Sequence, residues 1–331
     1  MIILREKKPT RDDHFVPRGY LKKFALDPQV KSPRIYQFDI DGIAEHKPVP
    51  INSICYKDRL YEIKDANGQI IVENGIEKSI NVLENRFYSV RNNILKKLFV
   101  INHQNCLTEK ERAILLQAAL LQLLRYEEIP AIFKSILTQL HPETINTPEH
   151  IKDIIAKIAC LPLFLNYDNV EMTEPMKKFK QWATRPPILY GLMQSFSTHH
   201  ICLGYNSITP LWICDRPVIV RSDSVHTFDM IIYPITPQLV VYIYSRDIPF
   251  PHHDNSLFYM THDEVNFLQQ EIVINAKRWI YSNRELSSQE RADIATIRKE
   301  INDKLIKLNG VVQLYSPQHK ITSTTTSHIK K

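Results

Sequence analysis

The chain has 331 residues, of which 44% are hydrophobic and 24% charged, and this composition excludes an intrinsically disordered protein. Its formal net charge of +6 is the excess of 42 basic over 36 acidic residues, and Lys320, Lys330 and Lys331 supply half of it. The rest of the chain is nearly neutral, which argues against strong non-specific binding to nucleic acid. The seven glycines form neither G-x-G-x-x-G nor G-x-x-x-x-G-K-[ST], which excludes a dinucleotide-binding fingerprint and a P-loop.

Cysteine usage and the start of the chain indicate the compartment. Five scattered cysteines without a C-x-x-C pair favour reduced thiols. The apolar run after Met1 is too short for a signal peptide, and no apolar run reaches the length of a bilayer span. We therefore expect a cytoplasmic protein without a membrane-spanning segment.

The stretch TRDDHFVPRGYLKKF, residues 10–24, places polar side chains directly before a proline-started turn. Pro17 suits the first position of a helix, because its φ is fixed and it has no N–H. The apolar residues that follow share one helical face and should form a buried anchor: Tyr20, Leu21 and Phe24. Two interpretations remain open. Either Asp13 or His14 caps a short docked helix, or the anchor fixes His14 in a pocket.

Strand signals follow the opening stretch. Residues 34–42 alternate in polarity and end on Asp41-Gly42, which predicts a hairpin. Residues 59–63 and 69–73 flank the turn KDANG and predict a second hairpin.

The middle of the chain has helical periodicity. Between residues 76 and 98, apolar residues recur at spacings of three and four, which predicts a long amphipathic helix. Thr108 and Glu111 form a capping box that opens a second long helix. Further helices are expected to start at Pro130 and at residues 147–149.

The pattern changes again near His200. Short runs rich in β-branched and aromatic residues predict strands over 200–245. Thr261 and Glu264 form another capping box, and the helix it opens is expected to end near Tyr281. A charged helix over about 287–308 should follow.

These elements together predict one α+β domain over residues 1–315. It combines N-terminal β-hairpins, a central helical layer, and a C-terminal antiparallel or mixed sheet with flanking helices. The parts are strands over 34–73, helices over 76–198, strands over 200–245 and helices over 261–308. Residues 316–331 are polar and lack periodicity, so a flexible tail is expected there.

One candidate for chemistry lies at the end of a predicted strand. In LWICDRPVIV, residues 211–220, Asp215 lies at the end of an apolar run, two residues before Pro217. Either the strand fixes an exposed site carboxylate, or Asp215 accepts backbone N–H groups in a turn.

Other candidates interrupt apolar helix faces. Glu77 and Glu84 are seven residues apart and share one face of their helix. Gln122 and Arg125 interrupt a run of leucines, so they should be partly buried. A buried arginine needs a carboxylate, and a structural brace therefore competes with a functional site at this position.

The motif His14-Phe15-Val16-Pro17, with its aromatic anchor, resembles the H-x-x-P motif of a largely bacterial family catalogued as domain of unknown function 4238. The resemblance covers about residues 12–282. Its other carriers are Ile76-Glu77, Gln122-x-x-Arg125, Cys214-Asp215-Arg216-Pro217-Val218, Tyr233-Pro234-Ile235-Thr236-Pro237 and Asn266…Ala276-Lys277-Arg278. The family has Ser-Asp-x-Pro where this chain has Cys214 before Asp215, so no nucleophile is assigned there. The family has no activity that the resemblance could imply for this chain.

The polar residues among these carriers are spread over distant segments, and we expect them to converge on one pocket. The expected catalytic residues are His14, Asp215, Glu77 and Arg125, and the expected substrate-binding residues are Gln122, Arg216, Asn266 and Arg278. In this hypothesis His14 acts as general acid or base, Asp215 orients it or binds a metal, and Arg125 stabilises anionic charge.

The chemistry that fits this set best is hydrolysis or group transfer on a phosphate-containing substrate, including nuclease activity. The expected partner is a nucleotide or nucleic acid, and a divalent metal ion is the candidate cofactor. The alternative is a non-catalytic module that binds a nucleotide or a protein, with the polar residues as a sensor site or a buried brace.

Overall fold

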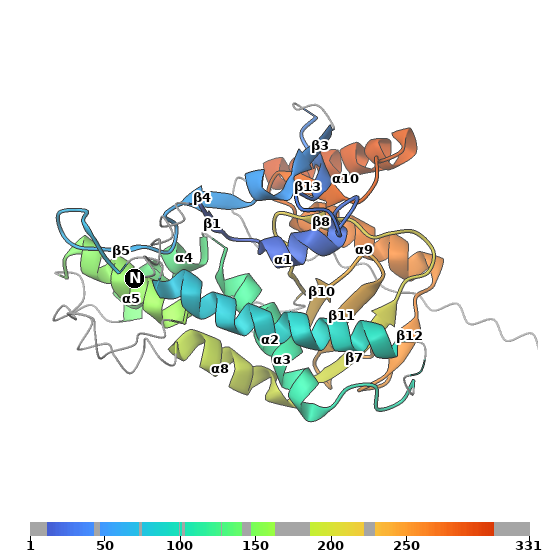
Figure 1. Cartoon of the computed structure of the whole chain (residues 1–331), viewed down its shortest axis with the longest axis horizontal. Coiled ribbons are helices and arrows are strands. Elements are labelled where there is room, and N and C mark those ends of the chain that lie inside the picture. The colour runs from blue at the N-terminus through green and yellow to red at the C-terminus, as the bar shows by residue number, and fades with distance from the viewer. Residues whose placement is uncertain are drawn as a thin grey trace, which may run out of the picture.

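A computed structural model describes residues 12–42, 47–72, 75–98, 100, 103–126, 128–140, 147–162, 186–221 and 229–307. Within these ranges the fold is α+β, as expected: N-terminal strand pairs, a layer of helices, and a mixed sheet with flanking helices. Figure 1 shows the helices of residues 75–97, 109–124 and 187–195 in the lower half of the view. Beside them lie strands that belong to the C-terminal half of the chain, at residues 200–205, 230–234, 239–244 and 257–259. The expected tail, 316–331, lies outside the described residues.

The helical layer contains the two long helices that periodicity predicts. Helix α2 spans Gly75–Lys97 and buries one apolar stripe at spacings of three and four. Helix α3 spans Glu109–Leu124 and begins at the expected capping box, in which Thr108 and Glu111 bond to each other's backbone. The layer also holds α4 (Glu128–Leu140), α5 (Glu149–Cys160), α8 (Pro187–Ser195) and the 3-10 turn η4 (Phe196–Thr198).

A five-stranded sheet packs against this layer. Its strands are β7 (His200–Tyr205), β9 (Ile219–Arg221), β10 (Met230–Pro234), β11 (Leu239–Tyr244) and β12 (Leu257–Tyr259). The order is β12-β7-β11-β10-β9, and only the pairing of β12 with β7 is parallel. The strands expected over 200–245 are therefore confirmed, and the sheet is mixed.

A four-stranded sheet combines two strands from the N-terminal part of the chain with two from the C-terminal part. Its order is β3-β2-β13-β8, with β2 at Arg34–Asp39, β3 at Lys47–Pro50, β8 at Ile213–Cys214 and β13 at Trp279–Ser282. Strands β2 and β3 form the first expected hairpin. The second expected hairpin is β5 (Ile63–Lys64) with β6 (Ile70–Val72).

Strand β13 corrects one prediction. Helix α9 spans His262–Asn275 and begins at the expected capping box, but it ends before the expected Tyr281. Residues 279–282 instead pair with both β2 and β8. Arg278 therefore lies in the turn between α9 and β13, not on a helix. The charged helix expected over about 287–308 is confirmed as α10 (Ser288–Lys307), and it packs on α9.

The opening stretch forms a strand and two short helical turns. Strand β1 (Asp12–His14) pairs with β4 (Tyr56–Asp58), and the 3-10 turn η2 (Ile51–Ser53) precedes β4. Helix α1 (Arg18–Leu21) follows Pro17 and continues into the 3-10 turn η1 (Lys22–Phe24). Figure 1 shows α1 lying along α2.

The apolar anchor of this stretch is confirmed. Tyr20, Leu21 and Phe24 are each 0% exposed. The ring of Tyr20 stacks on Tyr233 with centroids 5.4 Å apart, and its hydroxyl donates to the Pro234 carbonyl at 2.6 Å. The anchor therefore fixes the opening stretch to strand β10.

Close packing of α1 on α2 depends on a glycine. A Cβ atom at Gly19 would lie 2.6 Å from the far end of the Tyr88 ring, so the ring would have to shift to make room for it. Gly19 therefore lets the backbone of α1 reach the aromatic surface of α2.

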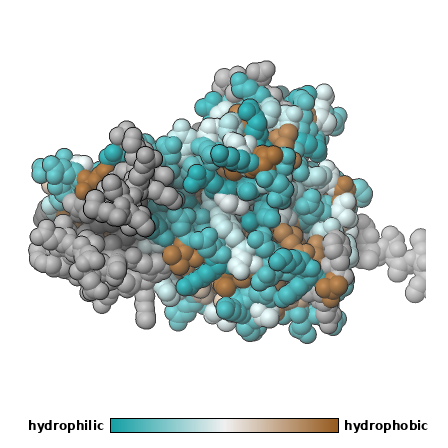
Figure 2. Space-filling model, in the orientation of Figure 1, coloured by the Kyte–Doolittle hydropathy of each residue, from teal (hydrophilic) through white to brown (hydrophobic). Residues whose placement is uncertain are grey.

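The surface shown in Figure 2 has hydrophobic residues scattered among hydrophilic ones, without a broad apolar patch on the described part of this face. No helix within the described ranges combines the length and the apolar character that a bilayer crossing requires.

The anchor gives the first testable prediction. Replacing Phe24 with alanine should lower the free energy of unfolding by about 3–5 kcal/mol, because a fully buried ring leaves a cavity. Chemical denaturation measures this change, with Leu26→Ala, at a 43% exposed site nearby, as a control that should shift little. An unchanged midpoint for Phe24→Ala would show that the turn is not docked.

Candidate functional site

A polar stripe runs along the buried side of α2. Glu77, Glu84 and Arg91 are spaced by seven residues, two turns apart, so they share one helix face. The opening stretch lies over this stripe, because Arg91 donates to the carbonyl of Gly19 at 3.3 Å. Such groups lose their water when they are buried and need other partners.

Arg125 is the most fully bonded group beneath the opening stretch. Its Nε donates to the hydroxyl of Tyr61 at 3.0 Å, its Nη1 donates to Glu84, and its Nη2 donates to the backbone carbonyl of His14. Burial alone would lower the pKa of Arg125, but Tyr61, Glu84 and Glu77 outweigh it and raise the pKa. The guanidinium is therefore a permanently charged bridge between β1, α2 and α3.

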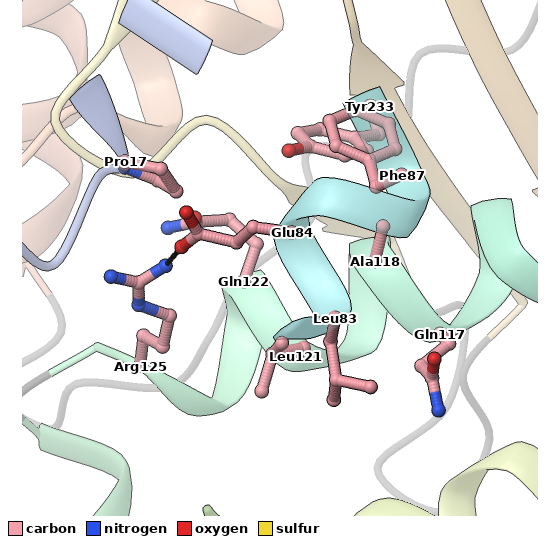
Figure 3. A pocket seen from close by; sticks show the side chains of 10 residues that line it. All are labelled: Pro17, Leu83, Glu84, Phe87, Gln117, Ala118, Leu121, Gln122, Arg125 and Tyr233. Atoms are coloured by element: carbon pink, nitrogen blue, oxygen red, sulfur yellow. Dashed lines mark hydrogen bonds and ion pairs between the residues drawn. The ribbon is translucent and has the colours of Figure 1, made fainter. Parts of the chain in front are cut away.

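Figure 3 shows the carboxylate of Glu84 reaching from α2 to the guanidinium of Arg125, with Pro17 and Gln122 beside it. The second oxygen of Glu84 accepts the hydroxyl of Tyr88 at 2.9 Å. Gln122 donates to the carbonyl of Phe15 at 2.8 Å. Helix α3 thus binds two consecutive backbone carbonyls of the H-x-x-P stretch.

The ring of His14 lies close to Tyr56, with centroids 5.7 Å apart. Its Nε2 is buried and has no hydrogen-bond partner. Burial, helped by the charge of Arg18, lowers the pKa of His14 to about 4. The imidazole is therefore neutral at pH 7.

Glu77 is perturbed in the opposite direction. Burial raises the pKa of Glu77 to about 7, the charge of Arg125 opposes the shift, and the nearby Glu84 and Asp13 add to it. Its Oε2 is buried without a hydrogen-bond partner. The Glu77 carboxyl therefore titrates much closer to neutral pH than an exposed glutamate does.

Asp13 and Lys157 extend this set of titratable groups. Asp13 accepts the backbone N–H of Tyr61 at 2.8 Å, and burial raises its pKa. Lys157, on α5, donates to the carbonyl of Glu62 at 2.6 Å, and burial lowers its pKa. We call Asp13, His14, Glu77, Glu84 and Arg125 the Arg125 cluster. Perturbed pKa values gathered in one place are typical of functional sites.

A small cavity borders the cluster between α2 and α3 (Figure 3). Glu84, Gln122, Arg125, Pro17 and Tyr233 are among its lining residues, and it leaves about 20 Å³ for the centre of a water molecule. That is room for about one water, which Gln122 Oε1, buried without a partner, could bond. The cavity is therefore too small to hold a substrate.

Four of the eight expected site residues lie in or beside the cluster: His14, Glu77, Gln122 and Arg125. The other four make their contacts elsewhere. Arg216 pairs with Glu128 at 2.6 Å, and Arg278 pairs with Asp39 at 3.1 Å. Asn266 is exposed on α9.

Asp215 organises the backbone after α9. Its Oδ1 accepts the N–H of Lys277 at 2.8 Å, and its Oδ2 accepts those of Arg278 at 3.0 Å and Trp279 at 3.2 Å. Both oxygens are thus used by the turn that starts β13. This matches the sequence interpretation in which Asp215 binds backbone N–H groups, although these belong to a distant segment and not to its own turn.

Sequence reasoning missed several residues near Arg125. Asp13 could have been found, because it precedes His14 in the motif. Tyr61 and Lys157 carry no sequence signal, since they reach the cluster only through the fold. In the part of the chain that the structure describes, no group of three His, Cys, Asp or Glu side chains is placed to bind a metal ion.

This geometry describes an α+β protein whose H-x-x-P stretch is bound along its backbone by a buried polar cluster. The family model described as a protein of unknown function (DUF4238) matches residues 13–285, and the chain belongs to this family. The match begins at Asp13 and includes the whole cluster. No curated protein and no solved structure matches the chain.

Asp215 gives the second testable prediction. Asp215→Asn keeps the shape but replaces an acceptor oxygen with an amide group, which leaves a partly buried N–H of residues 277–279 unpaired. The free energy of unfolding should fall by about 1–3 kcal/mol.

Denaturant unfolding measures this change. Arg216→Gln is the matched control, because it removes a partly exposed ion pair with Glu128 that should be worth about 0–1 kcal/mol. Equal stability of Asp215→Asn and wild type would show that the three backbone bonds do not stabilise the turn.

Proposed function

We propose that the chain is an enzyme in which Glu77 is the general acid and His14 the general base. The observation that carries this proposal is the pair of opposite pKa shifts, to about 7 for Glu77 and to about 4 for His14. Environments that push two titratable groups apart are how enzymes obtain an acid and a base at one pH.

The two side chains are also free to act. Glu77 Oε2 and His14 Nε2 are each buried without a hydrogen-bond partner. Buried polar atoms are nearly always bonded, so an unpaired one is often completed by a ligand or water. Between about pH 4 and pH 7, Glu77 has a proton to give and His14 has a lone pair to receive one.

The charge near these groups favours an anionic substrate. Arg18 is exposed, and its charge acts on both His14 and Glu77. We therefore propose hydrolysis or group transfer on a phosphate-containing substrate, with a nucleotide or nucleic acid as the leading class. The five cysteines are free and buried, which supports a reducing, cytoplasmic setting.

A non-catalytic module is the second candidate. It is favoured by Arg125, whose three donor nitrogens are all bonded within the protein. In that case the cluster is a brace, or a sensor that responds when a ligand reaches Glu77.

A panel of nucleotides, RNA and DNA, each with and without Mg²⁺ or Mn²⁺, tests the enzyme. Turnover should rise as pH increases through about 4 and fall as it increases through about 7, because His14 must be neutral and Glu77 protonated. Glu77→Gln should lower kcat by about 10²–10⁴-fold. Glu109→Gln, at a side chain that is 94% exposed, should leave kcat unchanged.

A second readout needs no substrate. The pKa of Glu77 is higher in the folded state than in the unfolded one, so its contribution to stability is complete below about pH 4.5 and is lost as pH rises through about 7. Glu77→Gln should therefore gain up to about 3 kcal/mol over wild type between pH 4.5 and pH 8.

Two results would contradict the acid role: full turnover by Glu77→Gln, or a stability difference that does not change with pH. The pH-dependent difference without turnover of any panel substrate would favour the sensor or brace.

A further inference from the structure

The last residue of the α2 stripe meets no counter-charge among the residues that the structure describes. Arg91 is 3% exposed, and its Nε and Nη1 are buried without hydrogen-bond partners. Its Nη2 makes one bond, 3.3 Å long, to the carbonyl of Gly19. The guanidinium lies 4.9 Å from the ring centre of Tyr88 and 5.5 Å from that of Phe87.

These contacts do not match the cost of burial. Contact with two aromatic faces stabilises a desolvated cation only in part, because removing an ion from water costs more than such contacts return. Arg125, on the neighbouring helix, meets the same cost with Glu84, a carbonyl and a hydroxyl. Arg91 forms no ion pair with a carboxylate in the ranges that the structure describes, and burial accordingly lowers its pKa.

A second cation, Lys23, lies in the turn that follows Gly19, whose carbonyl accepts a hydrogen bond from Arg91. Lys23, in η1, is partly buried, and its pKa is lowered by burial and then by the charge of Arg91. The cation in this turn and the cation on α2 repel each other, and an anion between them would stabilise both. Lys23 is partly exposed whereas Arg91 is buried, so an anion from solvent would reach the pair from the side of Lys23.

We propose that Arg91 and Lys23 form a binding site for a phosphate group. The site binds either inorganic phosphate or the phosphate of a small metabolite. A phosphate carries close to two negative charges at neutral pH, which two cations match, whereas a single carboxylate would leave one cation uncompensated. The unpaired Nε–H and Nη1–H of Arg91 then donate to phosphate oxygens.

This site is separate from the acid–base pair. Arg91 follows Glu77 by fourteen positions on one helix, which places their backbones about 21 Å apart. One small substrate does not span that distance, so the phosphate site acts as a second, ligand-responsive contact, between η1 and α2. A bound phosphate would hold η1 more tightly against α2 through Lys23 and Arg91.

Inorganic phosphate is the probe. Calorimetric titration and thermal melts of the full chain, at fixed ionic strength set with chloride, should show saturable binding and a rise in Tm with phosphate. Arg91→Met should weaken binding by about tenfold or more and abolish the rise in Tm. In chloride alone this variant should melt at or above the wild-type Tm, because an apolar side chain replaces an unpaired buried charge.

Lys23→Met should weaken phosphate binding without a large change of Tm in chloride. Lys22→Met is the matched control, since it removes the same charge from the neighbouring, exposed residue and should keep the wild-type response. Glu77→Gln should also keep it, which separates this site from the proposed acid–base chemistry. Glucose 6-phosphate in a parallel arm distinguishes a phosphorylated metabolite, expected to bind more tightly, from free phosphate.

Three outcomes would overturn the proposal. The first is that the wild type shows no phosphate binding, and the second is that Arg91→Met and Lys23→Met respond to phosphate as strongly as the wild type does. The third is a wild-type response to acetate that equals its response to phosphate. If Arg91→Met fails to fold, Lys23→Met against Lys22→Met decides by the same criterion.

Discussion

One buried guanidinium joins the segments on which this structure depends. Arg125 at the end of α3 donates to the carbonyl of His14, to Glu84 on α2 and to the hydroxyl of Tyr61. Removing one partner from such a buried pair typically costs about 3–5 kcal/mol, because the remaining charge stays desolvated. The position of the opening stretch over the helical layer therefore rests on this residue more than on any other polar contact described.

The H-x-x-P stretch gains a physical explanation from these contacts. Its polar partners bind its backbone: Arg125 takes the carbonyl of His14, and Gln122 takes that of Phe15. Val16 is completely buried, and Pro17 brings no N–H that would need an acceptor beside the cavity. The His14 side chain is then left with a free Nε2, and this is why we assign it chemistry in place of a structural bond.

The stripe on α2 divides into three environments. Glu84 is paired, Glu77 is a carboxyl that titrates near neutrality, and Arg91 is a cation without a carboxylate. Our two proposals follow from the two incomplete positions. Acid–base chemistry is placed at Glu77, and phosphate binding at Arg91.

Local patterns in the sequence predicted local structure well. Both capping boxes form, the periodicity of α2 is confirmed, and the anchor of Tyr20, Leu21 and Phe24 is buried. Strand β13 was missed because no glycine or proline separates it from α9. Its identity depends on pairing with β2 and β8 and on Asp215, which lies far away in sequence.

The candidate site was predictable only in part. A buried arginine at position 125 indicated a carboxylate partner, and Glu84 provides it. The bond from Arg125 to the His14 carbonyl was beyond sequence analysis, because every residue has a carbonyl. The environments of Asp13 and Lys157 arise where β1, β4 and α5 meet, and only the fold brings these together.

Hydrogen–deuterium exchange, followed by mass spectrometry, tests the central role of Arg125 most directly. In Arg125→Met, peptides that cover residues 12–24 should exchange faster than in wild type, because the opening stretch loses one of its two side-chain bonds to the α3 segment and keeps only that of Gln122. Peptides that cover β13 should keep their wild-type exchange rate. In the control Arg216→Met, peptides from both regions, residues 12–24 and β13, should exchange at the wild-type rate. Unchanged protection of residues 12–24 in a folded Arg125→Met protein would contradict the account.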